Sequence, residues 1–277
     1  MAYHTLVRAI EAARMPRSPS EAFADAIRHA VDGQLPLSRL HRAAGQIGPR
    51  RLGEGAIDRL LVDLIAIDLN PFTRRLAKAT NALAAIRMHR HYNARTDVAV
   101  LTEGRIGPGG KFEIASRHAP EAVDDPALCV DFHCAAMNLI FQMVDRRGPR
   151  GSAPPAGLAD VADKLGAPNL AARDAAAYFD SEPHGSVEGL ARRLGCSPRT
   201  LQRQLRRARV EASEIKRAAM LSHATNLLDT DATATAIAHD SGYADQAHMC
   251  RAFVKACGLT PTMLRHQQAS SDIPTPA

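Results

Sequence analysis

The sequence predicts a mainly α-helical protein with two domains. Trp is absent, and aromatic residues make up only 4% of the 277 residues, whereas Ala, Leu and Arg are abundant. Several segments place apolar residues three and four positions apart, which is the spacing of one helix face. One short pattern occurs twice in the last third of the chain. Together these features favour cores built by helix packing, and the length suits two domains.

Charge and cysteine content narrow the class of protein. The formal net charge is +6 and the pI is about 9.3, which suggests an anionic partner. The N-terminal residues carry charges, and no apolar run reaches the length of a membrane span, so we expect a cytoplasmic protein without a membrane partner. The five cysteines include no C-x-x-C pair, which argues against a disulfide framework and a structural zinc site. No metal and no cofactor are therefore expected.

The N-terminal region is expected to contain short helices. Ser20 is expected to cap a helix that ends at residue 31, and another helix is expected to start near Gly53. Asn70 followed by Pro71 is a typical helix start, because Asn caps free amide groups and Pro fits the first helical turn. This third helix is expected to reach about His91.

A small β-hairpin is expected after these helices. Apolar residues alternate over residues 97–103 and 111–116, on either side of a Gly-rich turn at residues 107–110. Pro126 then opens an amphipathic helix over residues 127–144.

Composition places the breaks between domains. Residues 146–157 are rich in Gly and Pro and are expected to form a loop, and a helical pair broken near Gly166 follows. The character of the sequence changes after residues 180–185. The expected organisation is an effector-binding or dimerisation domain at 1–150, connecting helices at 151–182, a second domain at 183–268 and a disordered tail at 269–277.

The second domain contains an internal repeat. The segments Leu190–Leu205 and Ile237–Phe253 both begin with an apolar residue and Ala, and both place Gly four residues after that Ala. Both end in an apolar-x-Arg-x-apolar pattern, and the second copy has one extra residue before it. The small Ala permits close helix packing, and Gly supplies the positive φ of a sharp turn. Each copy is therefore predicted to be a helix-turn-helix, which makes the C-terminal domain all-α.

The outward residues of the second helix in each copy suit contact with duplex DNA. Arg and Gln can pair with base edges in the major groove, and neighbouring Arg side chains can bind phosphates. Residues 199–209 contain five Arg and no acidic residue, and residues 183–268 hold 12 Lys and Arg against seven Asp and Glu. Most of the positive charge therefore lies in the C-terminal domain, as expected for a phosphate-binding surface.

The two copies, joined by a predicted helix over residues 212–228, resemble the DNA-binding domain of the AraC/XylS transcription regulators. The matching residues are LARRLGCSPRTLQRQL at 190–205, ATNLL at 224–228 and GYADQAHMCRAFVKACGLTP at 242–261. Three positions depart from the family pattern: Arg209 replaces a usual Gly, Met220 a usual Arg, and Met249 a usual aromatic residue.

The resemblance implies a sequence-specific DNA-binding regulator with two recognition helices in successive major grooves. Asp245 is the expected cap of the second recognition helix. The residues expected to face DNA are Ser197, Arg199, Gln202, Arg203, Arg206, Gln246, Ala247, Cys250 and Arg251. The N-terminal region resembles the arabinose-binding-type sensor domain in the order of its elements, which implies control by a small-molecule effector. RNA polymerase and a second copy of the chain are further candidate partners.

Three groups of residues in the N-terminal region are candidate sites. His89 and His91 face apart on a helix, so a solvated face is favoured over a metal pair. Cys129, His133 and Cys134 suit a thiol or metal sensor, although cysteines on an apolar helix face are the commoner arrangement. The helical spacing of five apolar residues favours core or a dimer interface over an effector pocket. They are Phe132, Ala136, Leu139, Ile140 and Met143.

Two alternatives to an effector-controlled regulator remain open from sequence. One is a thiol- or metal-responsive regulator that uses Cys129, His133 and Cys134. The other is an enzyme fused to a DNA-binding module, as in alkyl-DNA repair proteins with the same type of C-terminal domain. The repair reading requires a Cys cluster near the N-terminus, and the first cysteine is Cys129. No catalytic motif is present in the sequence, so we expect no enzymatic activity.

Overall fold

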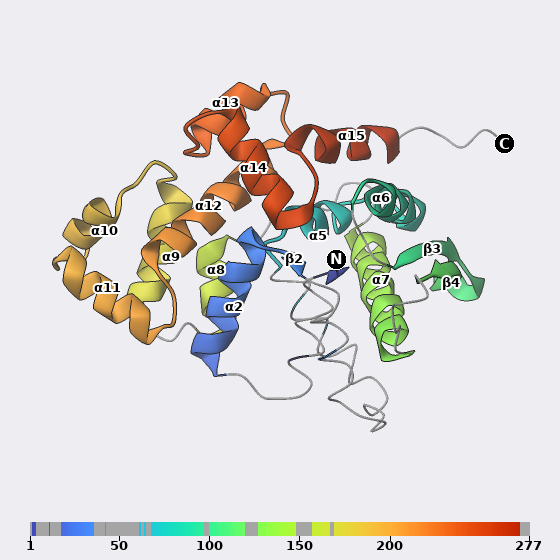
Figure 1. Cartoon of the computed structure of the whole chain (residues 1–277), viewed down its shortest axis with the longest axis horizontal. Coiled ribbons are helices and arrows are strands. Elements are labelled where there is room, and N and C mark those ends of the chain that lie inside the picture. Colours follow the sequence, from blue (N-terminus) through green and yellow to red (C-terminus); the bar gives the residue numbers. More distant parts are fainter. Residues whose placement is uncertain are drawn as a thin grey trace.

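One helix near the C-terminal end, α12 (Ala212–Leu227), contacts helices from both the N-terminal and the C-terminal parts of the chain (Figure 1). This computed structural model describes residues 2–3, 11, 18–35, 42, 61, 64, 68–96, 100–119, 127–147, 157–166 and 169–271. Helices dominate these residues, which confirms the predicted mainly α fold. The predicted helix near Gly53 and most of the predicted loop at 146–157 lie outside the described residues.

The C-terminal part consists of two helix-turn-helix units joined by α12. The first unit is formed by α10 (Val187–Arg193) and α11 (Pro198–Arg207), and the second by α13 (Ala234–Asp240) and α14 (Gln246–Cys257). The expected helical pair is present as α8 (Leu158–Lys164) and α9 (Leu170–Ser181). The last helix, α15 (Pro261–Ser271), continues three residues into the segment expected to be a tail.

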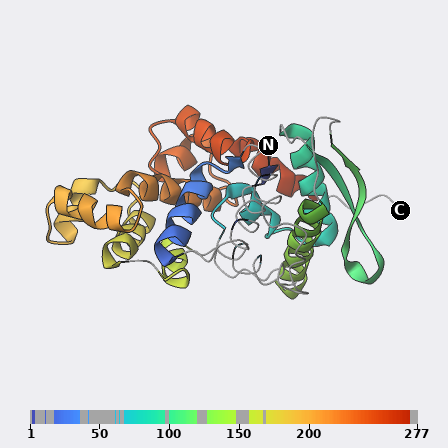
Figure 2. The same ribbon diagram turned by 60° about the horizontal axis from the view of Figure 1, so that its bottom comes forward.

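The described N-terminal elements are helices and two small antiparallel sheets. The helices are α2 (Pro19–Val31), α5 (Pro71–Leu76), α6 (Ala82–Arg95) and α7 (Ala127–Arg147). Strands β1 (Ala2–Tyr3) and β2 (Gln34–Leu35) form one sheet, and β3 (Leu101–Ile106) and β4 (Phe112–His118) form the other. Strands β3 and β4 are the predicted hairpin, shifted a few residues along the chain, and they lie at the edge of the molecule beside α6 and α7 (Figure 2).

One predicted helix start and one predicted helix end need correction. The first helix is capped by Ser18 and not by Ser20, because Pro19 occupies the first turn and Glu21 completes a capping box with Ser18. The Asn70 cap is confirmed, but the helix that it opens ends at Leu76. A second cap at Asn81 starts α6, so the predicted single helix is two helices with a turn between them.

Two apolar cores cross the predicted boundary between the N-terminal and C-terminal parts. One core joins Phe23 and Ile27 of α2 with residues of α8, α9, the first helix-turn-helix unit and the first half of α12. The other joins residues of α5, α6, β4 and α7 with the second half of α12, the second unit and α15. Each helix-turn-helix unit therefore shares its core with helices from the N-terminal part.

Helix α7 is apolar because it is a core helix. Its segment Ala127–Asp145 is long and apolar enough to cross a membrane by length and composition alone. In the fold, however, α7 packs against α6 and β4, and Phe132, Ile140 and Phe141 are buried in the core. The five apolar residues at helical spacing on this helix are thus core residues. Ala136 and Met143 are partly buried against the same cluster.

The expectation that His89 lies on a solvated helix face is wrong. His89 is only 2% exposed and its ring lies 5.0 Å from the ring of His133 on α7, whereas Arg90 is exposed. Burial lowers the pKa of His89 to about 4, and burial also lowers the pKa of His133 well below its ordinary value. Both imidazoles are therefore neutral at physiological pH and serve as core residues.

Because these histidines are buried in their neutral form, we expect the stability of the fold to decrease in mild acid. The pKa of His89 is about 4 in the fold and about 6.5 in the unfolded chain, so the unfolded state binds more protons between these values. The free energy of unfolding should therefore fall by about 2 kcal/mol between pH 7 and pH 5 from His89 alone. Urea unfolding at the two pH values measures this change. The His89→Gln variant should show a smaller pH dependence, whereas a variant at exposed His118 should match wild type. An unchanged slope in His89→Gln would contradict this assignment.

Candidate nucleic-acid interface

The first helix-turn-helix unit has the predicted turn. Gly195 adopts φ 61°, a left-handed conformation that Gly reaches without steric cost, and the amide of Cys196 donates to the carbonyl of Ala191 at 3.0 Å. Leu201 and Leu205 are fully buried, so they fix α11 against α10 and α9. The opposite side of α11 is consequently turned to solvent.

The first recognition helix presents the predicted polar residues to solvent. The hydroxyl of Ser197 accepts from the amide of Thr200 at 3.1 Å, and Pro198 occupies the first helical turn. The residues on the exposed side include Arg199, Gln202, Arg203 and Arg206. Within the described residues, these three arginines form no ion pair with an acidic side chain. Their guanidinium groups are therefore available to phosphates and base edges.

The second unit repeats this geometry with a longer turn. Gly242 adopts φ 82°, and a Cβ atom there would lie 2.5 Å from the carbonyl oxygen of Pro183, so both conformation and space require Gly. The carboxylate of Asp245 accepts from the amide of His248 at 2.6 Å, which confirms Asp245 as the cap of α14. Met249 and Phe253 are fully buried and anchor α14.

The outward residues of the second recognition helix offer fewer hydrogen-bonding groups to a base edge. Gln246, Ala247 and Arg251 are exposed, and Cys250 is half-buried. His248 is also exposed and its ring packs edge-on against Tyr243 at 5.2 Å, so it joins this surface. Helical spacing alone did not predict that His248 belongs to this surface. Its position follows from the packing of its ring on buried Tyr243, which precedes α14.

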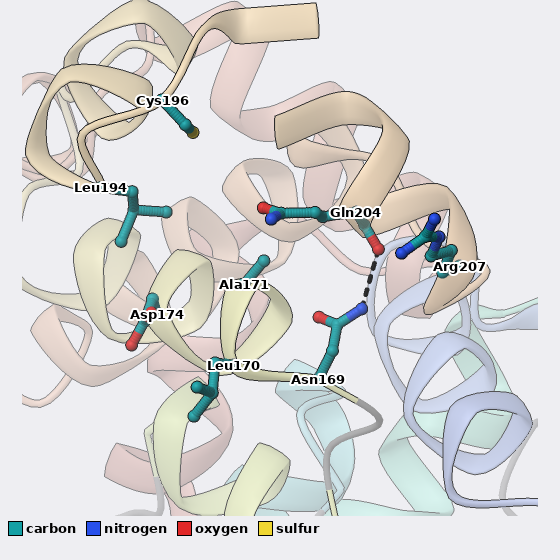
Figure 3. A pocket seen from close by; sticks show the side chains of 8 residues that line it. All are labelled: Asn169, Leu170, Ala171, Asp174, Leu194, Cys196, Gln204 and Arg207. Atoms are coloured by element: carbon teal, nitrogen blue, oxygen red, sulfur yellow. Dashed lines mark hydrogen bonds between the residues drawn. The ribbon is translucent and has the colours of Figure 1, made fainter. Parts of the chain in front are cut away.

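A groove of about 510 Å³ lies behind the first recognition helix, between α11 and α9 (Figure 3). Gln204 and Arg207 line it from α11, and Asn169 and Asp174 line it from α9. The side-chain amide of Asn169 donates to the backbone oxygen of Gln204 at 2.8 Å (Figure 3). Arg207 thus belongs to the rear of α11, which separates it from the predicted DNA-facing arginines.

The matching family is described as "Helix-turn-helix domain", and it covers residues 190–267. This range holds both repeated units and α12. Residues 190–267 form an AraC-type helix-turn-helix domain. The chain is accordingly a DNA-binding transcription regulator, and the predicted family of its C-terminal part is confirmed.

Comparisons of the whole chain add little to the AraC-type domain. No curated protein matches the chain. The chain is similar to the crystal structure of the transcriptional regulator CdpR from Pseudomonas aeruginosa, with 14% identity over 90% of this chain and 96% of that chain. The TM-score is 0.33, and a likeness of this size carries no argument about the N-terminal part.

Two departures of the AraC-type domain from its family pattern are core residues. Met220, at the position where an Arg is usual, is 6% exposed and lies in the core shared by α12 and the second unit. Met249 is fully buried in the same core. The flexible thioether of Met fills irregular space, so both positions are explained by packing. Met220 is therefore not a DNA contact.

The cysteines of the N-terminal part do not gather as a metal centre. Cys129 is buried, Cys134 is half-buried, and His133 lies in the core. Over the ranges that the structure describes, no three or more His, Cys, Asp or Glu residues are placed to hold a metal ion. Burial and the nearby Asp131 raise the pKa of the Cys134 thiol, which disfavours the reactive thiolate. These surroundings favour packing over sensing.

The two recognition helices predict unequal roles in sequence recognition. Arg199 can donate two hydrogen bonds to one guanine, whereas Ala247 and Cys250 next to Gln246 offer little to a base edge. Arg199→Ala should therefore relax sequence preference more than Gln246→Ala, with a cost of about 1–3 kcal/mol at the affected base pair. Selection of bound duplexes from random DNA with each variant measures the preference. A larger loss in Gln246→Ala would reverse the ranking.

The Asn169 side chain links α9 to the first recognition helix, so its substitution should lower stability. It accepts from the amide of Ala172 at 2.9 Å as a helix cap, and it donates to the oxygen of Gln204. Asn169→Ala removes both bonds and should cost about 1–2 kcal/mol of stability. Asn169→Asp keeps the cap and loses the donor, so it should lie between Ala and wild type in urea unfolding. Equal stability of all three proteins would contradict these bonds.

Proposed function

We propose that the chain is a one-component transcription regulator that reads a DNA operator with both recognition helices. The proposed base contacts are Arg199, Gln202 and Arg203 in the first unit and Gln246, Ala247 and Cys250 in the second. Ser197, Arg206 and Arg251 are the proposed phosphate contacts. All of these residues except half-buried Cys250 are exposed on helices whose opposite sides are buried, which supports this assignment.

The N-terminal part is proposed to carry control by a small-molecule effector. The observation that supports it is the core that joins α5, α6, β4 and α7 to the second helix-turn-helix unit. A change of packing around Phe112 or Phe132 in this core reaches Met249 and Phe253 of α14 without crossing solvent. Effector binding in the N-terminal part would therefore change the position of a recognition helix.

Buried arginines on α5 strengthen this connection. Arg75 is 2% exposed and forms an ion pair with Asp229 after α12, and Lys78 contacts the same carboxylate at 2.7 Å. Arg74 donates to the hydroxyl of Ser222 in the middle of α12. Burial lowers the pKa of Arg74 and of Arg75 to about 10, so both remain charged at neutral pH.

Further partners complete the proposal. A homodimer would place two copies of the DNA-binding domain on one operator, and RNA polymerase is the expected partner in transcription. The N-terminal part, proposed as residues 1–150, would supply the dimer contact, and the protein would act in the cytoplasm.

A binding titration of the full chain tests the proposal. A duplex selected from random DNA should bind at least about 1,000-fold tighter than a scrambled duplex at 150 mM salt, and its affinity should fall as salt rises. Equal affinity for both duplexes would contradict sequence-specific binding. Analytical ultracentrifugation of the same complex gives the number of copies bound.

Effector control has a separate test because coupling between two ligands is reciprocal. A small molecule that raises the Tm of the protein should change its affinity for the selected duplex, and the duplex should change the affinity of that molecule by the same factor. Binders that leave DNA affinity unchanged would contradict effector control and leave sequence-specific binding intact.

A further inference from the structure

Helix α2 contacts elements of both helix-turn-helix units. It has 13 residues, which gives a length of about 20 Å, and it packs along α12 and against α14 (Figures 1 and 2). Its buried residues Phe23 and Ile27 share a core with Ile215 of α12 and with Leu201 and Leu205 of α11. This apolar face anchors α2 on the DNA-binding domain.

Side chains from the first and the last turn of α2 are tied to the segment that follows the first recognition helix. Glu21 forms an ion pair with Arg209 at 2.8 Å. Arg28 contacts the carboxylate of Glu214 at 3.1 Å and donates to the backbone oxygen of Arg209. The connection between α11 and α12 is therefore held by two oppositely charged side chains of one helix.

Arg209 has an unusual backbone conformation for its residue type. It is the one described non-glycine residue with positive φ, at 58°, and it stands where the family usually has Gly. A side chain in this region is sterically strained, whereas Gly adopts the same conformation without strain. The guanidinium that this side chain supplies binds Glu21, so the departure from Gly provides a contact to α2.

The C-terminal end of α2 is tied to the second recognition helix. Asp32, the residue after the helix, contacts Lys255 of α14 at 3.3 Å. A Cβ atom on Gly33 would lie 2.3 Å from the backbone oxygen of Ala256, so the chain lies directly against α14 there. Asn70 donates to the same oxygen at 2.7 Å.

We propose that α2 is a splint between the two helix-turn-helix units, and that Glu21, Arg28 and Arg209 are positioning residues that set the half-site spacing accepted by the protein. Because Glu21 and Arg28 hold the connection after α11 while the residues after α2 hold the end of α14, α2 restricts the relative distance and rotation of the two units. This inference rests on the proposed reading of DNA by both units.

The ion pairs set orientation more than stability. Arg28, Arg209, Asp32 and Lys255 are about half exposed or more, and exposed ion pairs contribute little to stability. The buried face of α2 supplies the anchoring, and the charged contacts at both ends fix its rotation. Loosening one contact should therefore leave the fold intact and widen the range of positions open to the units.

The test uses the full chain and a duplex selected from random DNA with the wild-type protein. One base pair is inserted between the two contacted segments, which moves one segment by about 3.4 Å and rotates it by about 35°. The wild-type affinity should fall by about tenfold, the scale of one lost base-pair contact. Fluorescence anisotropy on both duplexes at fixed salt gives this spacing penalty.

Two variants break the same contact with opposite changes of charge. Glu21→Gln removes the ion pair but keeps the capping box with Ser18, since Gln serves there as well as Glu. Arg209→Gly removes the ion pair and relieves the positive φ. Both should reduce the spacing penalty from about tenfold to about threefold, because a single exposed ion pair holds the units only weakly. Arg209→Lys should restore much of the penalty because it keeps the charge.

The control is Arg207→Gln, which removes one positive charge from the rear of α11 and leaves the ion pairs of α2 with Arg209 and Glu214 in place. It should lower affinity for both duplexes equally and leave the spacing penalty at its wild-type value. Arg209→Gly should also be at least as stable as wild type in urea unfolding. A reduced spacing penalty in this variant is therefore not the result of a loss of stability.

Each outcome decides between the hypotheses. A reduced penalty in both Glu21→Gln and Arg209→Gly supports the splint. An unchanged penalty in both, or a selected duplex with only one contacted segment, overturns it while sequence-specific binding stands. A selection that enriches no sequence contradicts the proposed function itself.

Discussion

The fold depends on one constraint, which is that neither helix-turn-helix unit can bury its own apolar face. Helices α10 and α13 have only seven residues each, and two short helices leave one side of each pair open. Helix α12 covers part of both units, with Ile215 in one core and Leu221 in the other. The rest is covered by α2, α8 and α9 on the first unit and by α5 and α6 on the second.

This sharing of cores makes the N-terminal part a structural component of the DNA-binding domain. Buried Arg75 on α5 would be costly without Asp229, and its position between α12 and the oxygen of Leu264 on α15 fixes three elements at once. A helix that supplies both core and charge to a neighbouring unit cannot move without moving that unit. The proposed communication between the two parts would therefore need no element besides these shared cores and ion pairs.

Local features of the fold follow from sequence, and contacts between distant segments do not. The turns at Gly195 and Gly242 and the caps Ser197 and Asp245 were predictable, because they depend on residues within a few positions. The outward position of Arg199, Gln202 and Arg203 followed from the helical period. The burial of His89 did not, since its partner His133 lies more than forty positions away on another helix. The same is true of Arg75 and Asp229.

The three departures from the family pattern lie where the DNA-binding domain contacts distant segments of the chain, and helical periodicity does not predict such contacts. Met220 and Met249 are buried in the core that the N-terminal helices complete, so they suit neighbours specific to this chain. Arg209 is different, because it is exposed and strained and would be better replaced by Gly on local grounds. A residue that is locally unfavourable persists where a distant contact compensates, and the contact present at Arg209 is with Glu21 of α2. The three departures thus mark the places where the DNA-binding domain is fitted to the rest of its own chain.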